Sequence, residues 1–315
     1  MPRRSPFTSF GSQLAALAKP QLADLHLHTT KSDGTYAPSQ VAALAQQAGI
    51  TAIAVTDHDT LAAVEEVRAA AAEQLEVITG VEISAAFAAR EVHLLGYFVR
   101  SDHAELNAAL TSVCDRRRER FLDYIAKLAN KGHELPADRV NSIADATPSL
   151  GRRHVASLLV EHRITHSLTE AFHRFLSPLR EQVLPKVLVP VEEAIQLIHA
   201  AGGVASLAHP SAELDDDAFR TLAGYRLDAI EVEYPWGRNS RTAKLREVAK
   251  RFGFAVSGGS DCHGPNPSHR RIGSHGISLE ELESLRRLAA YGSQHARKRA
   301  AVDEQALAGD VPRLA

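Results

Sequence analysis

Short apolar runs of strand length alternate with amphipathic runs of helix length along most of this 315-residue chain. The pattern predicts strands at 22–27, 51–56, 75–84, 91–99, 204–208, 228–233 and 254–257. It predicts helices at 38–48, 61–73, 191–201, 215–223, 239–252 and 279–290. Such alternation is typical of an α/β fold in which crossover helices join parallel strands. At least six such units favour a closed barrel, although an open sheet is also compatible with the pattern.

The strand pattern stops between residues 101 and 186. Three helical patterns, at 102–131, 150–162 and 167–176, occupy this stretch. We therefore predict that residues 1–100 and 187–290 form the barrel and that 101–186 are a helical insertion. Residues 1–20 are predicted to be a leader and residues 291–315 a C-terminal tail.

Net charge and cysteine content indicate which binding partners and which cellular compartment to expect. The net charge is −2, so the whole chain offers no electrostatic reason to bind nucleic acid or a membrane. No stretch approaches the ~20 apolar residues of a membrane span. The basic start of the chain lacks the apolar run of a signal peptide. The two cysteines, Cys114 and Cys262, give no disulfide framework, which favours the cytoplasm.

Histidines and carboxylates gather where the predicted strands end. His26 and His28 alternate along the first strand, so both side chains project from the same face. In barrels of parallel strands, ligands bind at the carboxyl ends of the strands. The candidate metal ligands at or near such ends are His26, His28, Asp33, His58, Glu82, His93, His209, Asp261 and His263. Imidazole and carboxylate together suit Mn, Fe or Zn.

These residues stand in motifs that resemble the PHP family, named after polymerases and histidinol phosphatase. The motifs are Asp24-Leu-His26-Leu-His28, Ser32-Asp33-Gly34, Thr56-Asp57-His58-Asp59, Gly80-Val-Glu82, His93, His209-Pro210 and Gly259-Ser-Asp261-Cys-His263. The resemblance implies a distorted seven-stranded (β/α) barrel that holds two or three divalent ions, with Mn the first expectation.

The resemblance also implies a ligand set for each ion. One ion would be held by His26, His28, Glu82 and Asp261. Glu82 would bridge to a second, completed by His93 and His209, and a third would be held by Asp33, His58 and His263. Asp33 stands where many relatives have histidine. Asp33, His58, Glu82, Asp261 and His263 are the expected catalytic residues, because neighbouring cations can activate water and clamp phosphate oxygens.

The insertion carries basic residues, Arg116-Arg117-Arg118-Glu119-Arg120 and Gly151-Arg152-Arg153-His154. With Ala171-Phe172, Phe175-Leu176 and Lys186 they resemble the stand-alone nucleotide phosphatases of the family. That branch implies removal of the 3′-phosphate from nucleoside 3′,5′-bisphosphates, with the insertion over the active site. Arg117, Arg153, His154 and Lys186 are the predicted ligands of the second phosphate, since guanidinium forks bind phosphate well. Arg152-Arg153 replaces the usual Arg-Pro, so the register of these contacts stays open.

Three alternatives remain. The same branch includes 5′-to-3′ exoribonucleases on short RNA, although aromatic residues are 5% of the chain and do not interleave with the basic run. A histidinol-phosphate phosphatase fits the barrel, but the arginine-rich insertion speaks against it. A non-catalytic module fits poorly, because all nine ligand positions are filled. No membrane and no obligate protein partner are expected.

Overall fold

The computed structural model describes residues 22–236 and 239–292. The predicted leader therefore lies outside the described residues, as does all of the predicted tail except residues 291 and 292. Among the described helices, none is both long and apolar enough to cross a membrane.

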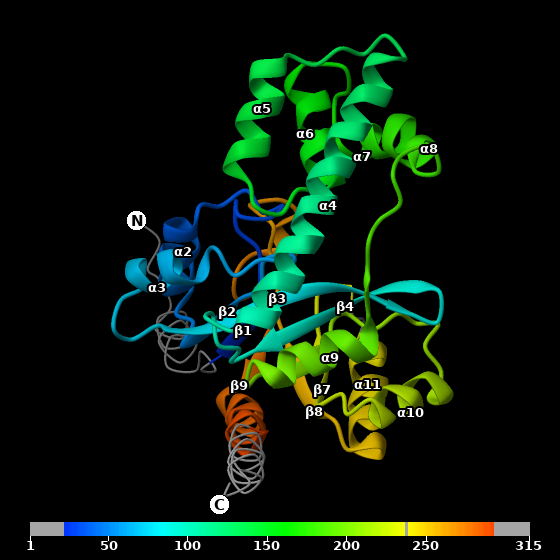
Figure 1. Ribbon diagram of the computed structural model, residues 1–315. Helices are drawn as coiled ribbons and strands as arrows, with labels where there is room; N and C mark the ends of the chain where they lie inside the picture. Colours follow the sequence, from blue (N-terminus) through cyan, green and yellow to red (C-terminus); the bar gives the residue numbers. More distant parts are fainter. Residues whose placement is uncertain (1–21, 237–238, 293–315) are drawn as a thin grey trace, which may run out of the picture.

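Seven strands form a nearly closed barrel, as predicted (Figure 1). They are β1 (Leu22–Leu27), β2 (Ala52–Val55), β3 (Glu76–Phe87), β4 (Arg90–Tyr97), β6 (Val204–Leu207), β7 (Ala229–Glu233) and β8 (Ala255–Gly258). The order in the sheet is β8-β7-β6-β4-β3-β2-β1. The backbone N–H of His28 donates to the carbonyl of Cys262, just past β8, at 3.0 Å. This contact brings the two ends of the sheet together.

Two short strands were not predicted. β5 (Val189–Pro190) pairs with β3, and β9 (Ile277–Ser278) pairs with β1. Strands of two residues are too short to produce a recognisable apolar alternation.

The prediction of parallel strands was wrong for β4, which is antiparallel to both β3 and β6. Only Ala88 and Ala89 separate β3 from β4, and both have positive φ angles, 47° and 60°. Two residues can close a hairpin, whereas a parallel crossover needs about a dozen or more. The reversal places the first half of β4 beside the last half of β3, at the end of the barrel where the parallel strands finish.

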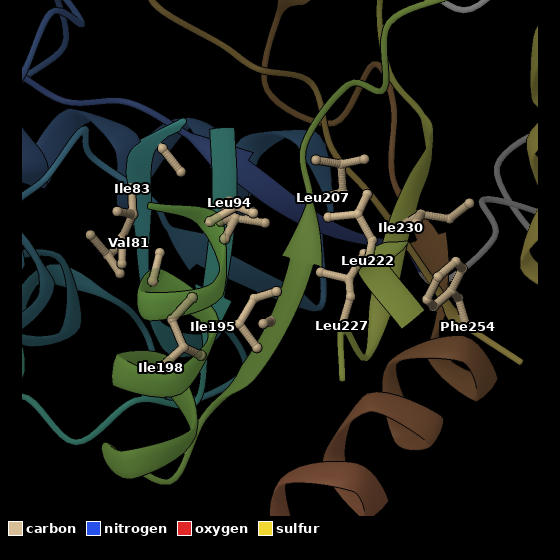
Figure 2. Close-up of a cluster of buried hydrophobic side chains, with 14 of the residues drawn as sticks. Val81, Ile83, Leu94, Ile195, Ile198, Leu207, Leu222, Leu227, Ile230 and Phe254 are labelled. Carbon is tan, nitrogen blue, oxygen red and sulfur yellow. The ribbon is translucent and has the colours of Figure 1, made fainter. Parts of the chain in front are cut away.

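Helices cover the outside of the barrel (Figure 1). They are α2 (Pro38–Ala48), α3 (Val64–Ala70), α9 (Val191–Ala200), α10 (Asp216–Gly224) and α11 (Asn239–Phe252), and residues 279–292 are also helical. Figure 2 shows how Ile195 and Ile198 of α9 pack on Leu94 of β4 inside the largest apolar cluster. The predicted helix at 61–73 is shorter than expected, because the backbone becomes extended at Ala71.

The regular elements of the inserted segment are all helices, and the segment stands over one end of the barrel (Figure 1). It contains α4 (Ala104–Ala129), α5 (Ala137–Ala146), α6 (Arg152–Glu161), α7 (Leu168–Ala171), a π-helical turn (Phe172–Leu176) and α8 (Ser177–Leu179). α5 and α8 were not predicted. The helices share an apolar core around Phe121, Tyr124 and Leu159, separate from the clusters of the barrel.

Candidate metal centre

All nine predicted ligands come together at one end of the barrel. His26 and His28 lie at the end of β1, with ring centroids 5.2 Å apart. His93 is the exception to the strand-end rule, since it lies in the first half of β4. It reaches the cluster because β4 is antiparallel and pairs His93 with Ser84.

Glu82 occupies the middle of the cluster and is 1% exposed. Its two carboxylate oxygens lie within 3.3 Å of nitrogen atoms of five histidines: His26, His28, His58, His93 and His209. Burial alone would raise its pKa, but the surrounding imidazoles together hold the pKa of Glu82 well below its usual range. Glu82 is therefore ionised, and its carboxylate would hold a cation in the cluster.

Two aspartates complete the cluster on the side of β8. Oδ1 of Asp261 lies 3.3 Å from Nε2 of His28 and 3.6 Å from Nε2 of His26. Oδ1 of Asp33 lies 3.1 Å from Nε2 of His263 and 3.8 Å from Nε2 of His58. The imidazoles keep the pKa of Asp33 well below its usual range, against the effect of burial.

Several of these atoms are buried without a hydrogen-bond partner. They are Nε2 of His26, Nε2 of His28, Oδ1 of Asp33, Nδ1 of His58 and Oε2 of Glu82. Leaving a buried donor or acceptor unpaired costs about 1–3 kcal/mol, more for a charged group. Burial lowers the pKa of His58 to about 3, so this imidazole is neutral and free to bind metal. Divalent cations would satisfy these atoms, and the residues present fit a metal cluster.

The donor atoms fall into four overlapping sets within 4.8 Å. The sets are His26-His28-Glu82, His58-Glu82-His93, His26-His209-Asp261 and His28-Asp33-His58-His263. They overlap with the ligand sets implied by the family resemblance but divide His58 and His209 differently. The assignment of ligands to individual ions stays a prediction.

The loops of the site depend on unusual backbone angles. His209, Asp261 and Asp59 have positive φ angles of 27°, 46° and 51°, which side chains rarely adopt and which often accompany functional sites. Gly259 approaches β1 so closely that a Cβ atom there would lie 2.3 Å from the backbone nitrogen of His26. No larger residue fits at this position without moving β1.

Two supporting residues were missed by the sequence analysis. Glu231, buried in β7, lies 3.0 Å from Nδ1 of His26 and accepts the backbone N–H of His209 at 2.6 Å. It fixes His26 so that Nε2 faces the cluster. The sequence feature that could have identified Glu231 is a charged residue between apolar residues inside a predicted strand. Arg270 lies 2.6 Å from Oδ2 of Asp261 and donates to its backbone carbonyl. Arg270 lies outside the predicted elements and gave no such signal.

A small basic pocket of about 60 Å³ lies between α4, α6 and Lys186. Its lining residues are Arg117, Arg120, Phe121, Tyr124, Leu150, Gly151, Arg152 and Lys186. Lys186 is bonded to Glu91, and Glu91 lies 3.1 Å from Nε2 of His93. Burial, with Arg117 nearby, lowers the pKa of Lys186. The pocket is thus one side chain away from the metal cluster.

The four predicted phosphate ligands differ in their surroundings. Arg117 and Lys186 line the pocket, whereas Arg153 and His154 do not. Both ring nitrogens of His154 are engaged, one by the backbone N–H of Gly151 at 3.0 Å and the other by the carbonyl of Ser32 at 2.9 Å. Arg152 lines the pocket instead, with its guanidinium 5.5 Å from the ring centroid of Phe172.

Comparison with solved structures gives a close match to the overall fold. A protein of Bifidobacterium adolescentis assigned as a metal-dependent phosphoesterase superposes with a TM-score of 0.76 at 26% identity. The match covers 85% of this chain and 96% of that one.

Sequence relatives match over most of their length. A 5′-3′ exoribonuclease of Haemophilus influenzae is 32% identical over 252 residues, which are 77% of this chain and 90% of the relative. A 3′,5′-nucleoside bisphosphate phosphatase of Chromobacterium violaceum is 29% identical over 261 residues, 79% of this chain and 90% of the relative. The family profile for the PHP domain matches residues 24–210, more than half of the chain. The chain belongs to the PHP domain family.

Proposed function

We propose that this protein removes the 3′-phosphate from nucleoside 3′,5′-bisphosphates, releasing the nucleoside 5′-phosphate and inorganic phosphate. Family membership and the donor set make it a metal-dependent phosphoesterase. The observation that carries the finer proposal is the basic pocket beside the cluster, joined to it through Lys186, Glu91 and His93. A substrate with two phosphates can place one on the metals and the other in this pocket.

Different residues would bind the two phosphates of the substrate. When bound, the divalent cations supply a hydroxide near pH 7 and neutralise charge on the phosphate oxygens. The nine donors of the cluster would hold these cations. Arg120, Arg152 and Lys186 would bind the 5′-phosphate by charge-assisted hydrogen bonds, which orients the nucleotide and places its 3′-phosphate over the cluster.

The relative from Chromobacterium violaceum that bears this activity in its name supports the proposal. Histidinol phosphate has a single phosphate and would leave the basic pocket without an anion. The lining of the pocket therefore favours a bisphosphate over that alternative.

The test compares adenosine 3′,5′-bisphosphate with a 5′-phosphorylated RNA trinucleotide as substrates of the Mn-loaded protein. We expect rapid release of phosphate from the bisphosphate, lost in Asp261→Ala because that change removes a cluster carboxylate. No phosphate release from the bisphosphate by the wild-type protein would refute the proposal. Retained turnover in Asp261→Ala would refute the metal-centred mechanism.

A second candidate function is 5′-to-3′ hydrolysis of short RNA. The relative from Haemophilus influenzae carries that name. A specific feature of this chain also favours it, an aromatic groove on the opposite side of the cluster from the basic pocket.

A further inference from the structure

An open groove of about 490 Å³ borders the metal cluster at His209. We name it the Trp236 groove; its lining residues are His209, Pro210, Ser211, Ala212, Tyr234, Trp236, Ser240 and Arg241. Trp236 is 54% exposed, although it is the single tryptophan of the chain and a large aromatic surface is costly to leave in water. Trp236 is not one of the donors of the metal cluster and does not line the basic pocket.

Trp236 is held against the metal centre from two directions. Its indole meets the ring of His209 edge to face, with centroids 5.6 Å apart. The guanidinium of Arg270 lies over the indole at 4.6 Å from the ring centroid, and Arg270 is itself fixed to Asp261. A cation over an aromatic face is attracted to the ring, so these two contacts orient the indole before a ligand binds.

The Trp236 groove and the basic pocket lie over opposite sides of the barrel. The pocket is anchored by Lys186 to Glu91 in β4 and by Arg117 to Asp59, which follows β2. Trp236 follows β7, which is separated from β4 by β6 and from β2 by β8 and β1. The carboxylate of Glu82 lies between the two sites. It contacts His93, which is next to Glu91 on the side of the basic pocket, and His209, which lines the Trp236 groove.

Because the two sites lie on opposite sides of the cluster, a bisphosphate and an RNA strand would contact different parts of the protein. A nucleotide with its 5′-phosphate in the basic pocket presents its 3′-phosphate to the cluster. A bisphosphate ends at that phosphate, so it would make no contact with the Trp236 groove. In RNA the same phosphate carries a second nucleoside, which extends away from the basic pocket and over the groove.

We propose that the Trp236 groove binds the base of the second nucleotide of a short 5′-phosphorylated RNA by stacking on Trp236. The proposal rests on the proposed function, since it uses the same cluster and the same pocket. Stacking of a base on an aromatic side chain is favourable for any base, because every base has a π-face. Arg241, whose guanidinium donates to the carbonyls of Pro210 and Ser211, adds a fixed positive charge to the groove.

The same bond is hydrolysed in both substrates. The oxygen of water bonds to phosphorus, the bond between phosphorus and the 3′-oxygen breaks, and that oxygen takes a proton. A bisphosphate gives phosphate and a nucleoside 5′-phosphate. RNA gives a nucleoside 5′-phosphate and a shortened strand that keeps its 5′-phosphate, so the product is again a substrate.

The test measures kcat/KM for the Mn-loaded protein on three substrates: adenosine 3′,5′-bisphosphate, 5′-phosphorylated diadenylate, and the same dinucleotide with an abasic second ribose. We expect Trp236→Ala to lower kcat/KM on the diadenylate about tenfold and on the other two by less than about twofold. Trp236→Phe keeps a stacking face and should retain most of the activity. Tyr291→Ala removes another exposed aromatic side chain, which is 63% exposed and lies in the helix at 279–292, and should change kcat/KM on none of the three substrates.

Fluorescence supplies a readout that does not depend on turnover. Because Trp236 is the single tryptophan, its emission in the metal-free protein reports on the groove alone. We expect quenching by the diadenylate and little change with the bisphosphate. The proposed stacking on Trp236 would be refuted by equal quenching with both ligands. It would also be refuted if Trp236→Ala lowered kcat/KM equally on all three substrates or on none of them.

The two proposals fail separately. Wild-type turnover of the bisphosphate tests the phosphatase alone. If that turnover is absent while Trp236→Ala still impairs the diadenylate selectively, the phosphatase is refuted and the groove stands. If the bisphosphate is turned over and Trp236→Ala changes nothing, the groove is refuted and the phosphatase stands.

Discussion

Nε of Arg117 lies 2.7 Å from Oδ2 of Asp59, and this buried ion pair joins the first helix of the insertion to the loop after β2. The other two nitrogens of the guanidinium donate to the carbonyl of Leu150 and to the hydroxyl of Ser84. Burial would raise the pKa of Asp59, but Arg117 holds that pKa below its usual range. In this arrangement Arg117 fixes the wall of the basic pocket, and its predicted contact with phosphate stays a prediction.

Arg117→Ala is therefore expected to destabilise the fold. The change leaves Asp59, which is fully buried, without its cation, and breaking such a pair costs about 3–5 kcal/mol. Urea unfolding of the metal-free protein measures the loss. Arg120→Ala, which removes a half-buried arginine from the same pocket, should cost less than about 1 kcal/mol. If Arg117→Ala is as stable as the wild type and only raises KM for the bisphosphate, Arg117 is a free phosphate ligand instead.

Glu231→Gln is expected to weaken metal binding. The carboxylate of Glu231 contacts Nδ1 of His26 and accepts the backbone N–H of His209, and an amide cannot accept both bonds as well. Loss of such a supporting contact typically costs about 10–100-fold in metal affinity. Calorimetric titration with Mn²⁺ measures it. The matched control is Glu233→Gln on the same strand, since Glu233 pairs with Arg246 outside the cluster. Unchanged affinity in Glu231→Gln would contradict the prediction.

Cys114 is expected to react slowly with thiol reagents. Burial and the nearby Asp59 carboxylate raise the pKa of the thiol to about 11, so near pH 8 very little thiolate is present. Because the thiolate is the nucleophile, alkylation of the native protein should be roughly a hundredfold slower than in urea. The rate should rise about tenfold for each pH unit between 8 and 10, because the thiolate fraction grows as the pH approaches the raised pKa. Peptide mass spectrometry reads the rate at Cys114, and equal rates in folded and unfolded protein would refute the prediction.

Local patterns were sufficient to predict the main strands and most of the crossover helices. The helix Pro38–Ala48 is a clear case, because a proline in its first turn and Gly49 at φ 72° mark both ends. The direction of β4 was not predictable from its apolar residues, because strand patterns are the same in both directions. The two-residue link of Ala88 and Ala89 contained the information, but the predicted strand ends at 84 and 91 concealed how short it is.

The metal cluster was predictable for a different reason. Its nine candidate ligands come from short motifs at strand ends, and parallel strands bring those ends together. Glu231 and Arg270 act through contacts with residues on other loops, which no local pattern encodes. The lining of the basic pocket was also only partly predictable from the sequence. Arg152 and Arg153 are adjacent on α6, so their side chains point about 100° apart and only the helix register decides that Arg152 lines the pocket.

His154 offers a direct test of whether the insertion binds phosphate or positions the cluster. It bridges the backbone N–H of Gly151 and the carbonyl of Ser32, one residue before Asp33. Burial lowers the pKa of His154, so the neutral ring accepts one bond and donates the other. Through this bridge the insertion holds the loop that carries Asp33.

His154→Ala should therefore lower kcat about ten- to a hundredfold on the bisphosphate and on a simple aryl phosphate alike, because Asp33 loses its fixed position. KM for the bisphosphate should change little, since His154 does not line the basic pocket. His166→Ala, an exposed histidine of the same insertion, is the matched control and should leave both rates unchanged. Steady-state kinetics on the two substrates separate the roles. A rise in KM confined to the bisphosphate, with kcat on the aryl phosphate intact, would show that His154 binds the second phosphate as the sequence predicts.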